Sequence, residues 1–129
     1  MARILIVEDN PDNMKLFRAL LSLKGHQVTA LLSGDGLLEA LAEQTPDLVL
    51  MDIQLPGRDG FALLSEIRAS RFADLRVVAL TAHAMSGDRE KARDAGFDEY
   101  ITKPIDIATF PDLVAQALAR PSGEAGESP

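Results

Sequence analysis

Four polar signals in this sequence each follow directly on a short apolar run. They are Glu8-Asp9, Asp52, Thr81 and Lys103-Pro104, which come after the runs at 4–7, 48–51, 77–80 and 100–101. Carboxylates, a hydroxyl and an ammonium are groups that hold a divalent cation and a phosphoryl group. Two carboxylates about 4 Å apart repel by roughly 4 kcal/mol at an effective dielectric constant near 20, so clustered acids need a cation. A single strand often ends in a polar residue, but all four signals together favour a site for metal and phosphoryl chemistry.

The elements that must position these residues are five strands and five helices in strict alternation. Runs rich in Leu, Ile and Val predict strands near 3–7, 27–31, 48–52, 76–80 and 99–102, with helical patterns between them. This alternation is typical of a doubly wound α/β fold, flavodoxin-like and (βα)5, with a five-stranded parallel sheet in the order 2-1-3-4-5. Ligands of such sheets bind outside the carboxyl ends of the strands, where this order brings Glu8, Asp9 and Asp52 together.

Capping residues predict where the helices begin and end. Asn10 and Pro11 predict the start of the first helix, and Gly25 predicts its end. The second helix is expected from Ser33 or Gly34 to Glu43, the third after Asp59, the fourth from about Ser86 to Ala95 with Gly96 as its cap, and the fifth from Asp106 or Thr109. Pro111 is tolerated only if the fifth helix begins late, because proline inside a helix removes a backbone hydrogen bond.

Apolar spacing predicts which helix residues face the core. They are Leu37, Leu38 and Leu41 in the second helix, Phe61, Leu64 and Ile67 in the third, and Leu113, Val114, Ala117 and Leu118 in the fifth. The two histidines are not part of this pattern, and His26, in the turn after Gly25, is expected on the surface.

The composition limits the class of protein. The 129 residues carry a net charge of −7 and include no cysteine. An acidic chain without a basic run argues against direct binding of nucleic acid or of an anionic membrane, and the lack of cysteine excludes disulfides and thiolate chemistry. No apolar stretch approaches the ~20 residues of a membrane span, and the start does not resemble a signal peptide. We expect a cytoplasmic protein with one domain at 1–120 and a disordered tail at 121–129.

The polar signals resemble, in order and spacing, the landmarks of the receiver domain of response regulators, the phosphoacceptor module of two-component signalling. The matching segments are Val7-Glu8-Asp9-Asn10, Met51-Asp52-Ile53-Gln54-Leu55-Pro56, Asp59-Gly60, Thr81-Ala82 and Lys103-Pro104. The resemblance covers residues 3 to 119. The segments 8–17, 51–56 and 81–88 look most like the stand-alone DivK-type regulators of cell division, and receivers fused to hybrid histidine kinases share similar stretches.

The resemblance implies a role for each residue of the acidic cluster. Asp52 would accept a phosphoryl group from a phosphohistidine on a sensor histidine kinase or a histidine phosphotransfer protein. Mg²⁺ would be held by Asp9 and Asp52, by the backbone carbonyl of Gln54, and by Glu8 directly or through water. Lys103 would pair with Asp52 and then with a phosphoryl oxygen, and its peptide bond to Pro104 would be cis.

The resemblance also implies a switch. Thr81 and Ala82 would bind the phosphoryl group, and Tyr100 would rotate into the space that Thr81 leaves, although Tyr100 could instead be an aromatic that covers the sheet edge. This change would alter the face formed by the fourth helix, the fifth strand and the fifth helix, where partners would bind. Gln54 and His83 would tune the lifetime of the phosphoryl group. The stimulus, the partner, the direction of phosphoryl flow and homodimer formation are left open.

The leading hypothesis is a single-domain response regulator of a phosphorelay, with no enzymatic activity beyond its own phosphorylation and dephosphorylation. A phosphatase of the haloacid-dehalogenase type would need a second aspartate two residues after the nucleophile, where Gln54 stands. A flavodoxin-like nucleotide binder would need a glycine-rich first loop, and the loop at 8–11 is acidic and has no glycine. The remaining alternative is a scaffold that works without phosphorylation, against which the acids, Thr81 and Lys103 argue.

Overall fold

Five strands and five helices alternate along the chain in the computed structural model, which describes residues 2–55, 59–82, 88–103 and 105–119. The strands are β1 (Arg3–Val7), β2 (Gln27–Leu31), β3 (Leu48–Asp52), β4 (Val77–Thr81) and β5 (Glu99–Thr102), and the helices are α1 (Pro11–Leu23), α2 (Leu37–Glu43), α3 (Gly60–Arg68), α4 (Asp88–Ala95) and α5 (Phe110–Ala119). All neighbouring strands pair in parallel, in the order β2-β1-β3-β4-β5. The predicted fold class and strand order are therefore confirmed.

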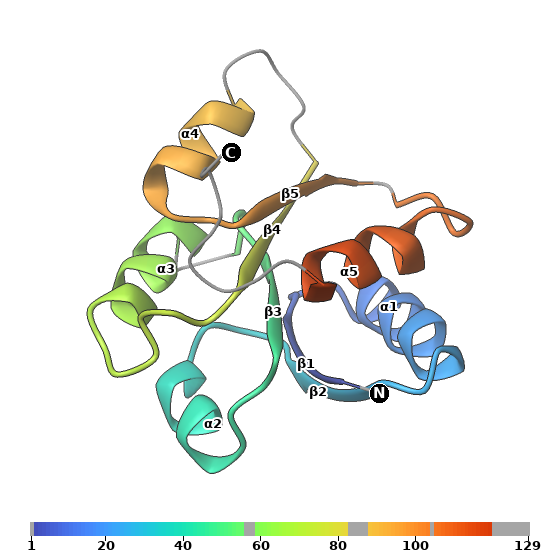
Figure 1. The fold of residues 1–129 in the computed structure, drawn as a ribbon, viewed down its shortest axis with the longest axis horizontal. Coiled ribbons are helices and arrows are strands. Elements are labelled where there is room, and N and C mark those ends of the chain that lie inside the picture. The colour runs from blue at the N-terminus through green and yellow to red at the C-terminus, as the bar shows by residue number, and fades with distance from the viewer. Residues whose placement is uncertain (1, 56–58, 83–87, 104, 120–129) are drawn as a thin grey trace.

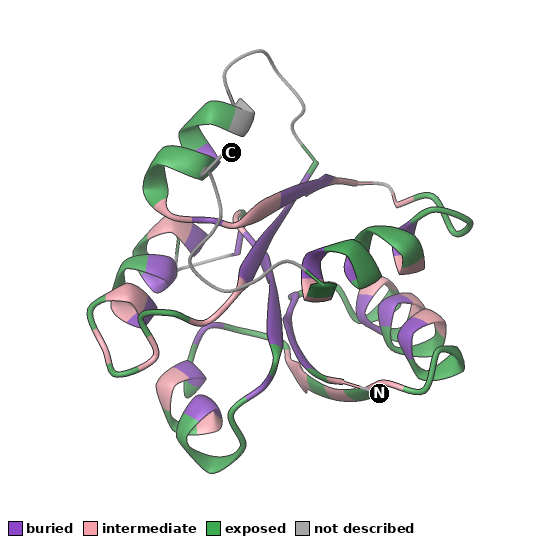
Figure 2. Cartoon of the chain, in the orientation of Figure 1, coloured by how far each residue is buried: buried purple, intermediate pink, exposed green. Residues whose placement is uncertain are grey.

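The helices cover both faces of the sheet, with α2, α3 and α4 on one side and α1 and α5 on the other (Figure 1). Successive strand side chains point to opposite faces, so β1 divides its residues between two cores. Leu5 and Val7 pack with the helices α2 to α4, whereas Ile4 and Ile6 pack with α1 and α5. Every residue of β3 and β4 is buried, which gives the central strands their continuous apolar runs (Figure 2).

The predicted caps form as expected. The Asn10 side chain accepts hydrogen bonds from the amides of Asp12 and Asn13, with Pro11 in the first turn of α1. The Asp59 side chain accepts from the amide of Phe61 at the start of α3. Gly25 and Gly96 have φ angles of +85° and +114°, which a residue without a Cβ adopts most readily after a helix.

Two helices and one strand begin later than expected. The prediction that α2 begins at Ser33 or Gly34 is wrong, because Gly36 has a left-handed φ of +78° and the helix begins only at Leu37. Strand β4 begins at Val77 rather than at 76. Helix α5 begins at Phe110, so Pro111 falls in its first turn, where proline is tolerated. The predicted start of the fourth helix at Ser86 and the predicted tail at 121–129 lie outside the described residues.

Leu64, Ile67, Val114 and Ala117 are buried as predicted, but other residues of α3 and α5 differ from the prediction. Leu113, expected in the core, is 37% exposed, whereas Phe110 is fully buried and stacks on Phe17 of α1 with the ring centroids 5.3 Å apart. In α3, Phe61 is only half-buried and packs edge-on against Phe97, and Leu63 lies in the core. Leu38 and Leu118 are also half-buried. Among the described residues, no helix is long and apolar enough to cross a membrane.

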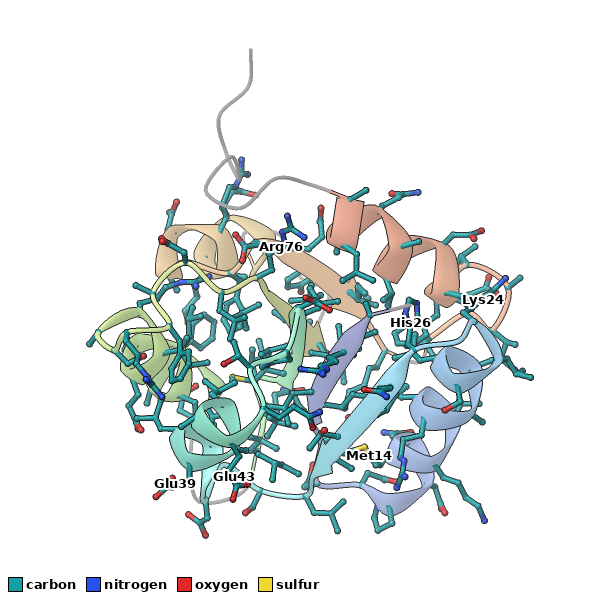
Figure 3. All side chains as sticks on the ribbon, turned by 60° about the horizontal axis from the view of Figure 1, so that its bottom comes forward. Met14, Lys24, His26, Glu39, Glu43 and Arg76 are labelled. Carbon is teal, nitrogen blue, oxygen red and sulfur yellow. The ribbon has the colours of Figure 1, made fainter. Side chains whose placement is uncertain are left out.

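His26, expected on the surface, is half-buried in the turn between α1 and β2 (Figure 3). Its Nδ1 accepts a hydrogen bond from the amide of Ala2, at 3.1 Å, so the ring must be unprotonated at that nitrogen. Burial, and next the positive charge of the N-terminus, lower the pKa of His26 below its usual 6.5. The pKa of His26 is thus lower in the folded than in the unfolded protein. The stability that neutral His26 contributes is therefore fully present above about pH 6.5 and is lost as the pH falls through the folded-state pKa.

We expect the free energy of unfolding of the wild-type protein to decrease as the pH is lowered from about 7.5 to 5. Relative to His26→Gln, in which the side chain does not titrate, the extra loss should be about 0.5–1 kcal/mol, the net value of one hydrogen bond. Urea unfolding curves of both proteins at several pH values would measure the difference. Parallel pH profiles of the two proteins would contradict this assignment.

Candidate functional site

The sheet register brings the four polar signals to one edge. Val7 pairs with Met51 and Asp52 pairs with Leu80, so the residues that follow β1, β3 and β4 emerge at the same level. The ladder between β4 and β5 extends one residue further, because the Lys103 amide donates to the Thr81 carbonyl at 2.6 Å. The carboxyl ends of four adjacent strands therefore form the candidate site.

Three carboxylates gather at this edge. Glu8, Asp9 and Asp52 each offer a carboxylate oxygen, and these oxygens all lie within 4.8 Å of one another. Glu8 is fully buried and Asp52 is 2% exposed, whereas Asp9 is exposed to solvent. Two of the three negative charges are thus held in a poorly solvated place, where their repulsion is not screened by water.

The Lys103 ammonium lies between the two buried acids. Its Nζ donates to Asp52 Oδ2 at 2.9 Å and to Glu8 Oε1 at 3.0 Å, across 51 and 95 residues of chain. Backbone amides bind the other two oxygens, because Gln54 donates to Asp52 Oδ1 at 2.8 Å and Asn10 donates to Glu8 Oε2 at 3.1 Å. Every carboxylate oxygen of the buried pair therefore accepts a hydrogen bond.

The charges in this cluster perturb one another. Burial raises the pKa of Glu8 above its usual value of 4.5, and the Asp52 charge adds to this effect, while the hydrogen bonds from Lys103 and Asn10 oppose it. Burial works to lower the pKa of Lys103, but its hydrogen bonds with Asp52 and Glu8 outweigh that effect and raise the pKa above 10.5. Lys103 is therefore an ammonium at neutral pH, next to both acids.

Thr81 and Tyr100 lie on the neighbouring strands. Thr81, the last residue of β4, is 1% exposed, and Ala82, which follows it, is exposed. Tyr100 is 9% exposed and belongs to the core under α2, α3 and α4. The predicted switch of Tyr100 stays a prediction. His83 and Pro104 lie outside the described residues, and with them the expected lifetime role of His83 and the cis bond between Lys103 and Pro104.

Sequence reasoning missed a close backbone contact at Gly60. A Cβ built on Gly60 would lie 2.5 Å from Ile53 Cα and 2.9 Å from the Asp52 carbonyl oxygen. Gly60 is the first residue of α3, after its cap Asp59. The pair Asp59-Gly60 was the available signal: Asp59 predicts the cap of α3, but the sequence pattern does not predict the close approach at Gly60. The structure shows that this glycine lets α3 begin directly against the end of β3, where Asp52 lies.

The donor set of the cluster fits a hard divalent cation. Carboxylate oxygens are the ligands that Mg²⁺ prefers, and carboxylates this close together favour a cation that offsets their repulsion. An ionised carboxylate such as that of Asp52 can act as a nucleophile toward phosphorus, and the Lys103 ammonium beside it can neutralise phosphoryl charge. The arrangement can therefore hold a metal ion and support phosphoryl transfer to a carboxylate.

Comparison with known proteins agrees with this site. Residues 4–115 match the response regulator receiver domain. The chain is 40% identical over 116 residues to the polar-differentiation response regulator DivK of Brucella ovis, covering 89% of this chain and 94% of that protein. It is 38% identical over 130 residues to the sensor protein GacS of Pseudomonas syringae pv. syringae, covering 95% of this chain but only 14% of GacS.

Among solved structures, the chain is similar to the receiver domain of the sensor histidine kinase PA1611 from Pseudomonas aeruginosa PAO1. The two share 35% identity with a TM-score of 0.82, over 92% of this chain and 98% of that one. That receiver was determined with a magnesium ion coordinated in its active-site cleft.

The chain belongs to the response regulator receiver domain family. Receiver domains take part in two-component signalling, in which a kinase supplies the phosphoryl group, and they are not classical enzymes. The cluster of Glu8, Asp9 and Asp52 fits the family's phosphoacceptor site.

Proposed function

We propose that this chain works as a single-domain response regulator in which Asp52 accepts a phosphoryl group from a phosphohistidine. The observation that carries the proposal is the contact between Lys103 Nζ and Asp52 Oδ2, at 2.9 Å, within a cluster of three carboxylates. A buried nucleophilic carboxylate, a fixed ammonium and further metal-ligating oxygens are together what phosphoryl transfer to aspartate requires. The donor would be a sensor histidine kinase or a histidine phosphotransfer protein.

In the transfer step, a carboxylate oxygen of Asp52 forms a bond to phosphorus as the bond from phosphorus to the imidazole nitrogen breaks. The bonding electron pair returns to that nitrogen, and an acyl phosphate forms on Asp52. Lys103 is an ammonium beside Asp52, so it is placed to follow the new phosphoryl oxygens and neutralise part of their charge. Because Lys103 also binds Glu8, moving toward the phosphoryl group would weaken that second contact.

A divalent cation fits the same edge. Asp9 and Asp52 would supply carboxylate oxygens, Gln54 its backbone carbonyl, and Glu8 a contact directly or through water. Mg²⁺ bound there would neutralise phosphoryl charge during the transfer. Each oxygen of Glu8 and of Asp52 already accepts one hydrogen bond, and each keeps a second lone pair with which it can bind a cation or a metal-bound water.

The response to phosphorylation would pass through Thr81 and Ala82 to the face formed by α4, β5 and α5. Thr81 would bind a phosphoryl oxygen through its hydroxyl, and Tyr100 of β5 would then change its packing. Partner proteins would bind the altered face, and a homodimer is left open. With an acidic chain of net charge −7, we expect protein partners in the cytoplasm rather than nucleic acid or a membrane.

The first test is the intact mass of the protein after incubation with acetyl phosphate, with and without Mg²⁺. We expect one phosphoryl adduct that needs Mg²⁺ and that is absent from Asp52→Asn. The matched control is Asp112→Asn, which changes an exposed aspartate in the first turn of α5, and it should form the adduct as the wild type does. A folded wild-type protein that forms no adduct would favour a scaffold that works without phosphorylation.

A further inference from the structure

One residue joins the end of β3 to the end of β4 across the candidate site. The backbone amide of Gln54 donates to Asp52 Oδ1 at 2.8 Å. The side-chain oxygen of the same residue, Oε1, accepts a hydrogen bond from the amide of Ala82 at 3.2 Å. Gln54 therefore contacts both the proposed phosphoacceptor and the residue that follows Thr81, 28 positions further along the chain.

We propose that the Gln54 side chain occupies the Ala82 amide in the unphosphorylated protein and must leave it when Asp52 is phosphorylated. This inference rests on the proposed function, in which Ala82 helps to bind the phosphoryl group. A single N–H makes one well-aligned hydrogen bond, so an amide oxygen of Gln54 and a phosphoryl oxygen compete for it. Gln54 is thus an internal competitor of the phosphoryl group.

The chemistry of the two acceptors determines which one the amide prefers. A phosphoryl oxygen carries negative charge, and charge-assisted hydrogen bonds are roughly twice as strong as neutral ones. The phosphoryl group therefore displaces Gln54, whose exposed side chain can turn to water. The hydrogen bond between Gln54 and the Ala82 amide must nevertheless be broken when the anion binds. The net free energy of one neutral hydrogen bond corresponds to a loss of affinity for a phosphoryl-like anion of about two- to tenfold.

This arrangement also links the two loops at the site. While Gln54 holds Ala82, the residue after β4 is tied to the residues that follow β3. Phosphorylation would break the hydrogen bond between Gln54 and Ala82, and a hydrogen bond from Ala82 to the phosphoryl group on Asp52 would replace it. Gln54 therefore favours the unphosphorylated arrangement, independently of any effect on the rate of hydrolysis.

The test uses BeF₃⁻, which binds an aspartate carboxylate as a stable phosphoryl mimic and involves no hydrolysis. Its affinity at saturating Mg²⁺ is measured for the full chain, for Gln54→Met and for Gln54→Asn. Methionine keeps the length of the side chain without a strong acceptor, and asparagine keeps the amide but shortens its reach. The control is Gln44→Met, the same exchange at an exposed position at the end of α2.

Both Gln54 variants should bind BeF₃⁻ about two- to tenfold more tightly than the wild type, and Gln44→Met should bind with unchanged affinity. Without BeF₃⁻, the Ala82 amide proton should move upfield in the NMR spectrum of Gln54→Met. The Phe61 amide, which donates to Asp59, should stay in place.

Unchanged or weaker BeF₃⁻ affinity in both Gln54 variants would overturn the inference, as would an Ala82 amide that does not move. These results would leave the proposed function intact, provided that the wild type still binds BeF₃⁻ and forms the acetyl phosphate adduct at Asp52. A wild type that does neither would contradict the proposed function itself, and this inference with it.

Discussion

Replacing Lys103 with methionine should lower the free energy of unfolding by about 3–5 kcal/mol in metal-free buffer. Glu8 is fully buried and Asp52 nearly so, and Lys103 donates a hydrogen bond to each. Methionine fills a similar volume but leaves the two acids without their ammonium. The protein loses stability because two negative charges then stay uncompensated in a poorly solvated place, next to a third carboxylate on Asp9.

Mg²⁺ should restore part of this loss. A cation held by the cluster offsets the same repulsion that Lys103 offsets, so Mg²⁺ should stabilise Lys103→Met more than it stabilises the wild type. Urea unfolding of both proteins, with and without about 10 mM Mg²⁺, would measure the two increments. Phosphorylation of Lys103→Met by acetyl phosphate should nevertheless be slow, because no ammonium follows the phosphoryl oxygens.

The control for this prediction is Lys15→Met, which removes an ammonium from the exposed face of α1. Surface changes of this kind usually alter stability by no more than about 0.5 kcal/mol. If Lys103→Met were as stable as Lys15→Met in metal-free buffer, Lys103 would not be neutralising the buried acids. An equal response of the wild type and Lys103→Met to Mg²⁺ would argue that the cation binds elsewhere.

Replacing Gly60 with alanine should damage both the fold and the site. The added Cβ would meet the backbone of Ile53 and of Asp52, at 2.5 Å and 2.9 Å, and a backbone cannot move aside as a side-chain end can. Such overpacking costs about 1–3 kcal/mol. The strain falls on the strand end that carries Asp52, so we expect the rate of phosphorylation by acetyl phosphate to fall in the fraction that remains folded.

The control is Gly36→Ala, which introduces backbone strain without a close contact of the kind made at Gly60. Gly36 has a φ of +78°, but a Cβ there would meet no atom within 4 Å. Alanine should therefore cost about 1 kcal/mol from the left-handed conformation alone and leave phosphorylation unchanged. If Gly60→Ala lost no more stability than Gly36→Ala and were phosphorylated at the wild-type rate, the close packing of α3 against Asp52 would not matter for function.

The sheet and the acidic cluster could be predicted because they rest on short-range rules. Apolar runs of β-branched residues and leucine mark buried parallel strands, and the handedness of their connections leaves few possible orders. Once the order is known, the residues after β1 and β3 must be neighbours. The pairing of Lys103 with Asp52 was predicted from the family resemblance, whereas the second contact of Lys103, with Glu8, was not predicted.

The helix details depended on tertiary packing, which spacing alone does not determine. A pattern that allows both Phe110 and Leu113 to face inward does not say which one does, and the stacking of Phe110 on Phe17 decided it. The start of α2 depended on a positive φ at Gly36, and glycine adopts both signs of φ. The hydrogen bond between Gln54 and Ala82 and the close approach at Gly60 depend on loop geometry, which produces no periodic pattern in the sequence.

The most direct test of the account is to identify the residue that carries the phosphoryl group. After incubation with acetyl phosphate and Mg²⁺, sodium borodeuteride reduces an aspartyl phosphate to deuterated homoserine and leaves free carboxylates unchanged, so peptide mass spectrometry locates the modified position. We expect deuterated homoserine at position 52 and unmodified Glu8 and Asp9. Label at either of those residues, or none in a folded protein that carries the adduct, would contradict Asp52 as the phosphoacceptor.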